Sequence, residues 1–361
     1  MSPPLDLIAL SLLPAWRWRL VAEQLRSGDP ASDILHAHCA DGRRGRARPP
    51  AWTDASRLLA RAADALAAAA ARGIQPLTRN DPEYPRQLAE IADPPTLLWA
   101  IGNPSVLSTP MVAIVGSRAG SSYALGVAER LASDLAARGL TVVSGLARGV
   151  DSSAHQGALS AGGVTVGVLG CGVDIIYPRE HEPLARAMCE RGAVISELVP
   201  GTVPKPPFFP LRNRIISGLA RAVVVVEAGQ KSGSLITARC ALEQGRDVLA
   251  VPGNVLNGRN RGGHALLRDG ARLVETAEDV CDEIGWGGGT IGRADMVEVG
   301  GAQADPVLAV LTPGESAEVG QISAETGLSV GDLLPRLMDL ELRGLVRREP
   351  GGRFMRCGRP C

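Results

Sequence analysis

Lysine and aromatic residues are scarce in this chain of 361 residues. It has two lysines, three phenylalanines and three tyrosines, and aromatic residues make up 3% of the sequence. The apolar core must therefore be built mostly from Ala, Val, Leu and Ile. Basic and acidic residues are equal in number, at 38 each. A nucleic-acid partner could therefore be bound only through a local basic patch, because whole-molecule attraction is absent.

Paired cysteines and long apolar runs are also missing. Seven cysteines are scattered along the chain without a Cys-x-x-Cys pair, which argues against a zinc ribbon and leaves a disulfide framework without a pattern. The chain begins without the features of a secretory signal, and no apolar run reaches membrane-spanning length. We therefore expect no metal site, no membrane association and a cytoplasmic location.

The first 110 residues are predicted to contain a helical domain and a connector. Short helical patterns fill residues 1–72, where Thr53 or Asp54 caps an alanine-rich helix. The arginine run 43–48 is interpreted as a solvated loop, with a phosphate contact as the minor alternative. Residues 73–110 are rich in proline and lack clear periodicity, so we predict an extended connector.

Residues 111–285 are predicted to form a doubly wound α/β domain. Apolar β-branched runs alternate there with helical patterns. Runs that are apolar throughout must be covered on both faces, which is typical of a mostly parallel sheet wrapped by helices. The predicted strands are Met111–Val115, Leu140–Ser144, Val164–Leu169, Ala193–Ser196, Ala222–Val226, Asp247–Val251 and Ala271–Val274.

The last part of the chain is predicted to be a separate small module. Residues 286–304 are glycine-rich and are interpreted as a linker. Residues 305–356 show three helical patterns followed by a hairpin pattern, which indicates a winged helix-turn-helix. Pro335 inside the third helix is expected to kink or shorten it.

Basic residues follow three of the predicted strands. They are Arg118 in Gly116-Ser117-Arg118, Arg148 in Gly145-Leu146-Ala147-Arg148, and Lys231. Ligands of doubly wound sheets bind beyond the carboxyl ends of the strands, where glycines admit a close approach and helix N-termini present free N–H groups to phosphate. Tight turns alone explain part of these glycines, but they do not explain a basic residue after three separate strands.

The same turns argue against nucleotide cofactors. Gly116-Ser117-Arg118-Ala119-Gly120 does not match Gly-x-Gly-x-x-Gly, and the second strand ends without an acidic residue for a ribose. Gln230-Lys231-Ser232 resembles the end of a P-loop but lacks its glycines. A dinucleotide oxidoreductase and a P-loop enzyme are therefore disfavoured.

Two acidic positions are candidates for hydrolysis. Asp151 and His155 lie one helical turn apart with serines between them, but no third ligand or activating partner stands nearby. We interpret Asp151 as the cap of its own helix. Glu227 ends an apolar strand and could orient an arginine or bind a hydroxyl group.

The segment 204–218 concentrates the scarce residues. Lys205 precedes Phe208-Phe209, and Arg212-Asn213-Arg214 follows. Aromatic rings beside fixed positive charges suit a single nucleic-acid strand, because bases stack on rings and phosphates pair with guanidinium groups. A buried aromatic pair next to a capped helix is the alternative.

These motifs, in their order along the chain, resemble the DNA-processing protein A family (DprA, also called Smf). The resemblance rests on Asp81-Pro82-Glu83-Tyr84-Pro85, Val115-Gly116-Ser117-Arg118, Ser144-Gly145-Leu146-Ala147-Arg148-Gly149, Gly170-Cys171-Gly172, Phe209-Pro210-Leu211-Arg212-Asn213-Arg214, Ser232-Gly233-Ser234 and Val251-Pro252-Gly253. No single motif is specific, but their ordered combination is.

The resemblance implies a Rossmann-like domain that binds single-stranded DNA in a basic pocket, flanked by a sterile-alpha-motif-like domain and a winged helix. It implies a homodimer that protects incoming strands and delivers them to a RecA-type recombinase in natural transformation. Family members are not known as enzymes, so neither catalysis nor a cofactor is expected. The strand-binding residues expected on these grounds and from the turns are Gly116, Ser117, Arg118, Gly145, Arg148, Lys205, Phe209, Arg212, Asn213, Arg214 and Lys231.

Two other functions stay open. A nucleotide-hydrolysing enzyme of the lysine-decarboxylase-like Rossmann group would carry Pro-Gly-Gly-x-Gly-Thr-x-x-Glu, which Pro252-Gly253-Asn254 breaks. A duplex-binding regulator would use the third helix of the winged module. That helix carries Asp332, Asp339 and Glu341 beside its arginines, which makes reading of the major groove doubtful.

Overall fold

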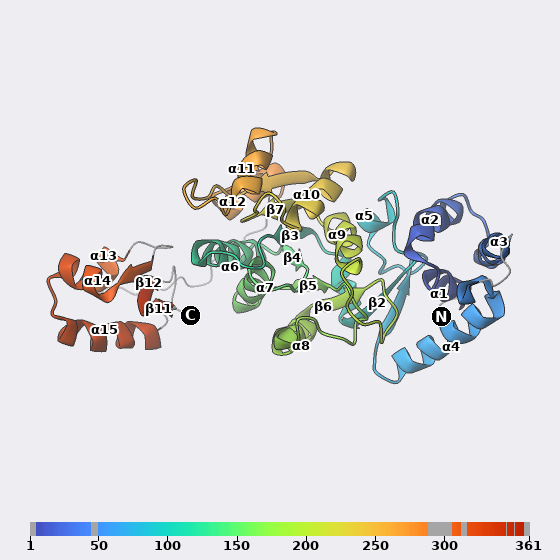
Figure 1. The fold of residues 1–361 in the computed structure, drawn as a ribbon, viewed down its shortest axis with the longest axis horizontal. Coiled ribbons are helices and arrows are strands. Elements are labelled where there is room, and N and C mark those ends of the chain that lie inside the picture. Colours follow the sequence, from blue (N-terminus) through green and yellow to red (C-terminus); the bar gives the residue numbers. More distant parts are fainter. Residues whose placement is uncertain are drawn as a thin grey trace.

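A nine-stranded sheet forms the centre of the protein in a computed structural model (Figure 1). The structure describes residues 5–44, 50–287, 305–311, 316–343, 345–349 and 351–356. The strand order is β1-β2-β6-β5-β4-β3-β7-β8-β9. The strands are β1 (Gln75–Thr78), β2 (Leu97–Gly102), β3 (Met111–Val115), β4 (Thr141–Ser144), β5 (Thr165–Val168), β6 (Ala193–Ser196), β7 (Ala222–Val225), β8 (Asp247–Ala250) and β9 (Arg272–Leu273).

The strands from β3 to β9 are parallel, which confirms the predicted fold class. Strand order runs outward in both directions from β3 and β7, which are paired with Val112 opposite Ala222. The order therefore reverses between these two strands, and the crevice beyond their carboxyl ends is the expected ligand site of such a sheet.

Residues 73–110 do not form the extended connector that their prolines predict. They contribute β1 and β2, which join the sheet antiparallel through pairing of β2 with β6. Burial explains this outcome, because Leu97, Leu98 and Trp99 are fully buried between the sheet and its neighbours. The hydrophobic effect on this short run outweighs the weak strand signal.

Helices cover both faces of the sheet (Figure 1). One face packs apolar side chains of α9 and α10, and the other packs those of α6, α7 and α12. Ser121 starts α6 by accepting a hydrogen bond from the Ala124 amide. The helices are α5 (Arg86–Ala89), α6 (Ser122–Ala137), α7 (Val150–Ser160), α8 (Glu182–Arg191), α9 (Phe208–Leu219), α10 (Ser234–Glu243), α11 (Arg261–Arg268) and α12 (Ala277–Glu283).

The N-terminal helices form a cluster beside β2. Their apolar residues share a core with Trp99, which ties this domain to the sheet. The Asp54 side chain accepts from the Arg57 amide and caps α4, as one of the two predicted capping residues. The helices are α1 (Leu5–Ser11), α2 (Trp18–Arg26), α3 (Ala31–Arg43) and α4 (Ala55–Ala70); of the predicted arginine run, residues 45–48 lie outside the described residues.

The C-terminal module has the predicted winged-helix elements. Three helices pack on a three-stranded sheet of order β10-β12-β11. The longest helix runs through Pro335, so the expected shortening does not occur. The elements are α13 (Pro306–Val310), β10 (Ser316–Glu318), α14 (Val319–Thr326), α15 (Val330–Leu342), β11 (Val346–Glu349) and β12 (Arg353–Arg356). Most of the predicted linker, residues 288–304, lies outside the described part of the chain.

Candidate nucleic-acid interface

Two loops touch at the carboxyl edge of the sheet, one after β3 and one after β4. The Val150 amide donates to Ser117 O at 3.2 Å, and the Ser117 amide donates to Glu227 O at 2.7 Å. Gly149 has φ +79°, and a Cβ atom there would lie 2.3 Å from Ser117 O. The close approach of the loops therefore needs glycine at this position.

The loop after β4 is shaped by the Asp151 carboxylate. This group accepts hydrogen bonds from the Gly145 amide at 3.1 Å and the Ala147 amide at 3.4 Å. It holds the buried Leu146 at φ 56°, a left-handed conformation that is unfavourable for a leucine. The expectation that Asp151 caps its own helix is thus wrong, because its carboxylate binds the preceding loop.

Arg118 and Phe209 meet above this loop. The Arg118 guanidinium lies 5.2 Å from the centre of the Phe209 ring, within cation–π range. The Tyr177 ring lies 5.6 Å from the Phe209 ring, with the two planes tilted by 39°. Phe209 is half-buried and Arg118 is exposed, so an aromatic face and a positive charge stand together at the surface.

Tyr177 was not predicted. It follows the third parallel strand by nine residues, and only its rarity among the aromatics could have marked it. Gly170 explains the place of its partner ring, because a Cβ atom at Gly170 would lie 2.9 Å from Phe209 Cδ1. The Gly170-Cys171-Gly172 turn therefore makes room for the ring.

Arg212 lies beneath these residues. Its side chain is buried, and Nη1 donates to Val168 O at 2.7 Å. Burial lowers the pKa of this guanidinium, the nearby Asp151 carboxylate opposes that shift, and Arg118 adds to it. Its Nε has no partner among the described residues. Arg212 thus supplies positive charge from below, while only its neighbour Arg118 reaches the surface.

Gly145→Ala is expected to displace the charged side chain of Arg212. A Cβ atom there would lie 1.6 Å from Arg212 Nη1, so the guanidinium would have to move from its buried position. We expect a loss of about 1–3 kcal/mol in the free energy of unfolding, as for other overpacked sites. Urea denaturation measures this. Gly126→Ala is the matched control, because its Cβ would meet nothing within 4 Å and helix propensity favours alanine there.

Arg214 and Asn213 are separated from this group. Arg214 is buried, with Nε donating to Asp93 at 2.9 Å and Nη2 donating to Glu197 at 2.7 Å. Asn213 donates to Gly233 O at 3.3 Å and holds the loop before α10. Their hydrogen bonds join the elements around α9, and both side chains are largely withdrawn from solvent.

The remaining predicted cations are exposed. Arg148 forms an ion pair with Glu180 on the loop that follows Tyr177. Lys205 lies in the loop before α9, and Lys231 lies in the turn before α10. Gly116, Ser117, Arg118, Gly145, Arg148, Phe209 and Arg212 are thus linked by loop contacts, whereas the two lysines stand on separate loops.

Phe208 is half-buried, as Phe209 is, so it is not the buried aromatic of the alternative interpretation. It lines a small cavity of about 10 Å³ with Trp18, Leu198 and Leu211. The aromatic pair therefore divides, with Phe208 toward the N-terminal helices and Phe209 toward Arg118.

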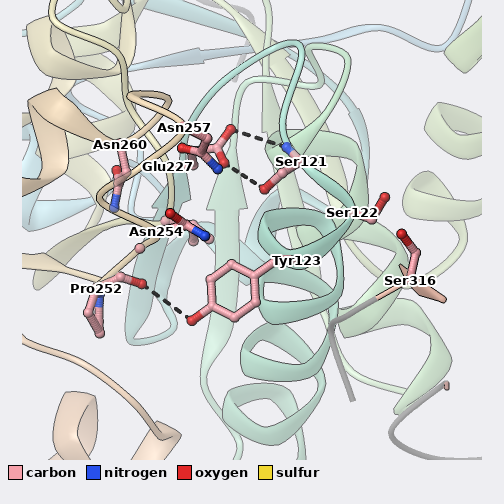
Figure 2. A pocket seen from close by; sticks show the side chains of 11 residues that line it. Ser121, Ser122, Tyr123, Glu227, Pro252, Asn254, Asn257, Asn260 and Ser316 are labelled. Atoms are coloured by element: carbon pink, nitrogen blue, oxygen red, sulfur yellow. Dashed lines mark hydrogen bonds between the residues drawn. The ribbon is translucent and has the colours of Figure 1, made fainter. Parts of the chain in front are cut away.

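A larger cavity of about 560 Å³ lies between the start of α6 and the turns after β7 and β8 (Figure 2). The Glu227 carboxylate stands in its wall and accepts from both the amide and the hydroxyl group of Ser121, at 3.1 and 2.6 Å. Glu227 thus binds a hydroxyl group, one of the roles considered for it, and fixes the start of α6.

The remaining candidates for catalysis are held in structural contacts. His155 is fully buried, and its Nδ1 lies 2.6 Å from Thr165 Oγ1.

Within the described residues no group of three His, Cys, Asp or Glu side chains could hold a metal ion. In the same part of the chain no helix is both long and apolar enough to span a membrane.

Comparisons with known proteins agree with this arrangement. Residues 75–285 match the family described as DNA recombination-mediator protein A, and residues 299–352 match the DprA winged helix domain. Protein Smf of Escherichia coli is 40% identical over 287 residues, which cover 77% of this chain and 76% of that protein. DNA processing protein DprA of Streptococcus pneumoniae is 46% identical over 200 residues, covering 55% and 71%.

Two solved structures share the fold. DNA processing protein A from Streptococcus pneumoniae has 35% identity and a TM-score of 0.66, over 78% of this chain and 99% of that one. DNA processing protein A from Helicobacter pylori, whose structure concerns its single-stranded DNA binding mode, has 29% identity and a TM-score of 0.53, over 58% and 95%. The chain therefore belongs to the DprA/Smf family of DNA-processing proteins.

Proposed function

We propose that this protein binds single-stranded DNA at the carboxyl edge of its sheet and acts as a recombination mediator without catalysis. In this proposal a homodimer protects incoming strands and loads them on a RecA-type recombinase in natural transformation. The observation that supports it most is the stack of the Arg118 guanidinium and the Tyr177 ring on Phe209. A base stacked beside this ring would place its phosphate near a fixed positive charge.

The division of the predicted residues refines the proposed site. Arg118, Phe209 and Tyr177 would contact the strand, and Gly116, Ser117 and Gly145 would let it approach the backbone of the loops after β3 and β4 closely. Arg212 would raise the local positive potential from beneath. Arg214 and Asn213 would act indirectly, by holding α9 in place. We retain Arg148, Lys205 and Lys231 as proposed peripheral phosphate contacts.

Ring and charge should contribute separately to strand binding. Phe209→Ala is expected to weaken binding of a dT oligonucleotide about tenfold or more, since a stacked base contributes about 1–3 kcal/mol. Arg118→Ala should weaken it and also reduce its salt dependence. Fluorescence anisotropy of a labelled oligonucleotide measures both.

Arg130→Ala is the control for charge, because Arg130 is exposed on α6, the helix that follows the loop of Arg118. Phe209→Leu separates the ring from the apolar bulk. Undiminished affinity in both Arg118→Ala and Phe209→Ala, with folding intact by circular dichroism, would contradict the proposed site.

The winged helix offers duplex binding as a second function, and its charges disfavour that function. Arg336 on α15 pairs with Asp305 at 3.0 Å, and Arg343 pairs with Asp339 at 3.2 Å. Acidic partners reduce the attraction that these arginines could offer to phosphate. Competition between a dT oligonucleotide and duplex DNA on the full chain separates the functions, and preference for duplex would favour the winged helix.

Nucleotide hydrolysis is the other alternative. Asp151, His155 and Glu227 each hold a contact that shapes the fold. Release of free base from nucleoside monophosphates by the purified protein would support that activity instead.

A further inference from the structure

The cavity of about 560 Å³ at the switch point of the sheet is not part of the proposed strand site. It lies between the start of α6 and the turns that follow β7 and β8 (Figure 2). Phe209 is not among its lining residues and packs instead beside Gly170, in the turn after β5. Its volume falls within the range of small-molecule sites. The lining residues are Ser121, Ser122, Tyr123, Val226, Glu227, Pro252, Gly253, Asn254, Asn257, Asn260 and Ser316.

Two asparagines that line the pocket use their side-chain oxygens within their own loop. Asn254 Oδ1 accepts from the Leu256 amide at 2.7 Å, and Asn257 Oδ1 accepts from the Arg259 amide at 3.0 Å. These bonds fix the side chains and leave each Nδ2 group without a partner among the described residues. Asn260 differs, because Oδ1 accepts from Ala228 and Nδ2 donates to Val251 O.

The wall that carries Glu227 offers acceptors. Each of its carboxylate oxygens accepts one hydrogen bond from Ser121, and each retains a second lone-pair position. The ring of Tyr123, 40% exposed, adds a flat apolar face, and its hydroxyl group donates to Pro252 O at 3.3 Å. Amide donors, carboxylate acceptors and a flat face thus surround one space.

The charge of the lining excludes a phosphate as the main ligand. No arginine or lysine is among its lining residues, and Glu227 is acidic. We propose that this pocket binds one uncharged nucleobase, with Asn254 and Asn257 donating to its carbonyl groups and Glu227 accepting from its N–H groups. Flat rings that carry both N–H and C=O groups match this set of donors and acceptors.

Two sources share this chemistry, a free nucleoside and a base of a bound strand. The second source rests on the proposed strand site. Arg259 Nη1 donates to Ala119 O at 3.1 Å, so the asparagine loop is joined to the loop that carries Arg118. A strand that passes Phe209 would have to cross this loop for one of its bases to enter the pocket.

The test is isothermal titration calorimetry of the full chain with thymidine and guanosine, with deoxyribose as the control without a base. Asn254→Asp and Asn257→Asp keep the Oδ acceptors of the two turns and replace each Nδ2 donor by an oxygen. Asn103→Asp is the matched control, because Asn103 is exposed and its Oδ1 accepts from the Ser105 amide at 3.1 Å, away from the pocket.

Saturable binding of a nucleoside to the wild type, weakened at least about tenfold in both pocket variants and unchanged in Asn103→Asp, is the expected result. If the base comes from the strand, thymidine also competes with a dT oligonucleotide and the pocket variants weaken oligonucleotide binding. If it is a free nucleoside, oligonucleotide binding stays unchanged.

Absence of saturable nucleoside binding, together with unchanged oligonucleotide affinity in the pocket variants, would overturn the inference. Nucleoside binding that survives both substitutions would overturn it equally. Neither result contradicts the proposed strand site. That proposal is contradicted only if the wild type does not bind the oligonucleotide or if Arg118→Ala and Phe209→Ala bind it normally.

Discussion

Arg214→Ala is expected to lower the free energy of unfolding by about 3–5 kcal/mol, the range for removing one partner of a buried ion pair. The guanidinium binds two carboxylates, Glu197 at 2.7 Å and Asp93 at 2.9 Å. Arg214 and Glu197 both have 8% of their side chains exposed. Removal of the arginine leaves the Glu197 charge buried without compensation, and that desolvation is the main reason for the loss.

The pH dependence of the free energy of unfolding of Arg214→Ala identifies the cause of its loss of stability. Burial already raises the pKa of Glu197, and the charge of Arg214 opposes the shift. Without Arg214 the pKa rises further, so Glu197 is protonated more readily and the penalty shrinks as the pH falls. Urea denaturation at several pH values measures the loss of stability in Arg214→Ala. The double variant Arg214→Ala with Glu197→Gln should recover part of that loss at neutral pH.

Arg148→Ala serves as the control for the loss of an arginine from an ion pair. Its pair with Glu180 is exposed to water, so little change in stability is expected. An equal loss in both variants, or a loss in Arg214→Ala that Glu197→Gln does not relieve, would contradict the role assigned to the buried pair.

The parallel sheet was predictable because its strands are buried on both faces. Met111–Val115 and Ala193–Ser196 have the predicted bounds, since an apolar run that begins directly after a proline or a glycine allows few other interpretations. The winged helix was predictable for a similar reason, because helical spacing and hairpin turns are local signals. Local signals also marked the glycine loops after β3 and β4, which contact each other in the structure.

Long-range pairing explains what the sequence could not show. Arg212 and Arg214 are two residues apart, and their neighbours in the sequence predict that both bind phosphate. Their different roles depend on Asp93, which is 121 residues away from Arg214, and on Glu197. β1 and β2 were missed likewise, because Pro76 lies inside β1 and prolines at 94, 95 and 104 flank β2, so that only the pairing of β1 with β2 and of β2 with β6 defines them.

His155→Asn is expected to remove a loss of stability of about 3 kcal/mol that the wild type suffers between about pH 7 and pH 4. Burial lowers the pKa of His155 from 6.5 to about 3, with the charge of Arg212 contributing. Below pH 6.5 the unfolded chain takes up a proton that the folded chain does not bind until about pH 3. The unfolded state therefore binds more protons in this window, and stability falls as the pH falls.

The hydrogen bonds of the ring explain why the folded state refuses the proton. Thr165 Oγ1 donates to Val142 O at 2.8 Å, so the ring atom 2.6 Å from it, Nδ1, must be the donor between them. Nε2 is buried and has no partner among the described residues, and protonation would leave a charged N–H group without an acceptor. An asparagine amide can donate to Thr165 in place of Nδ1 and does not titrate.

Denaturant unfolding at about pH 7, 5.5 and 4 gives the free energy of unfolding of the wild type and of His155→Asn. The quantity of interest is how steeply this free energy changes with pH in each protein. Asn is smaller than His, so the variant starts from a lower stability at neutral pH, and that offset does not enter the dependence of stability on pH. His264→Asn is the control, because His264 is only partly buried and its Nε2 already lies 3.0 Å from Gly253 O. If His155→Asn loses as much stability on acidification as the wild type does, then the ring is not the group that resists the proton, and the acid sensitivity comes instead from carboxylates whose pKa is lowered in the folded state, such as Glu278 and Asp279.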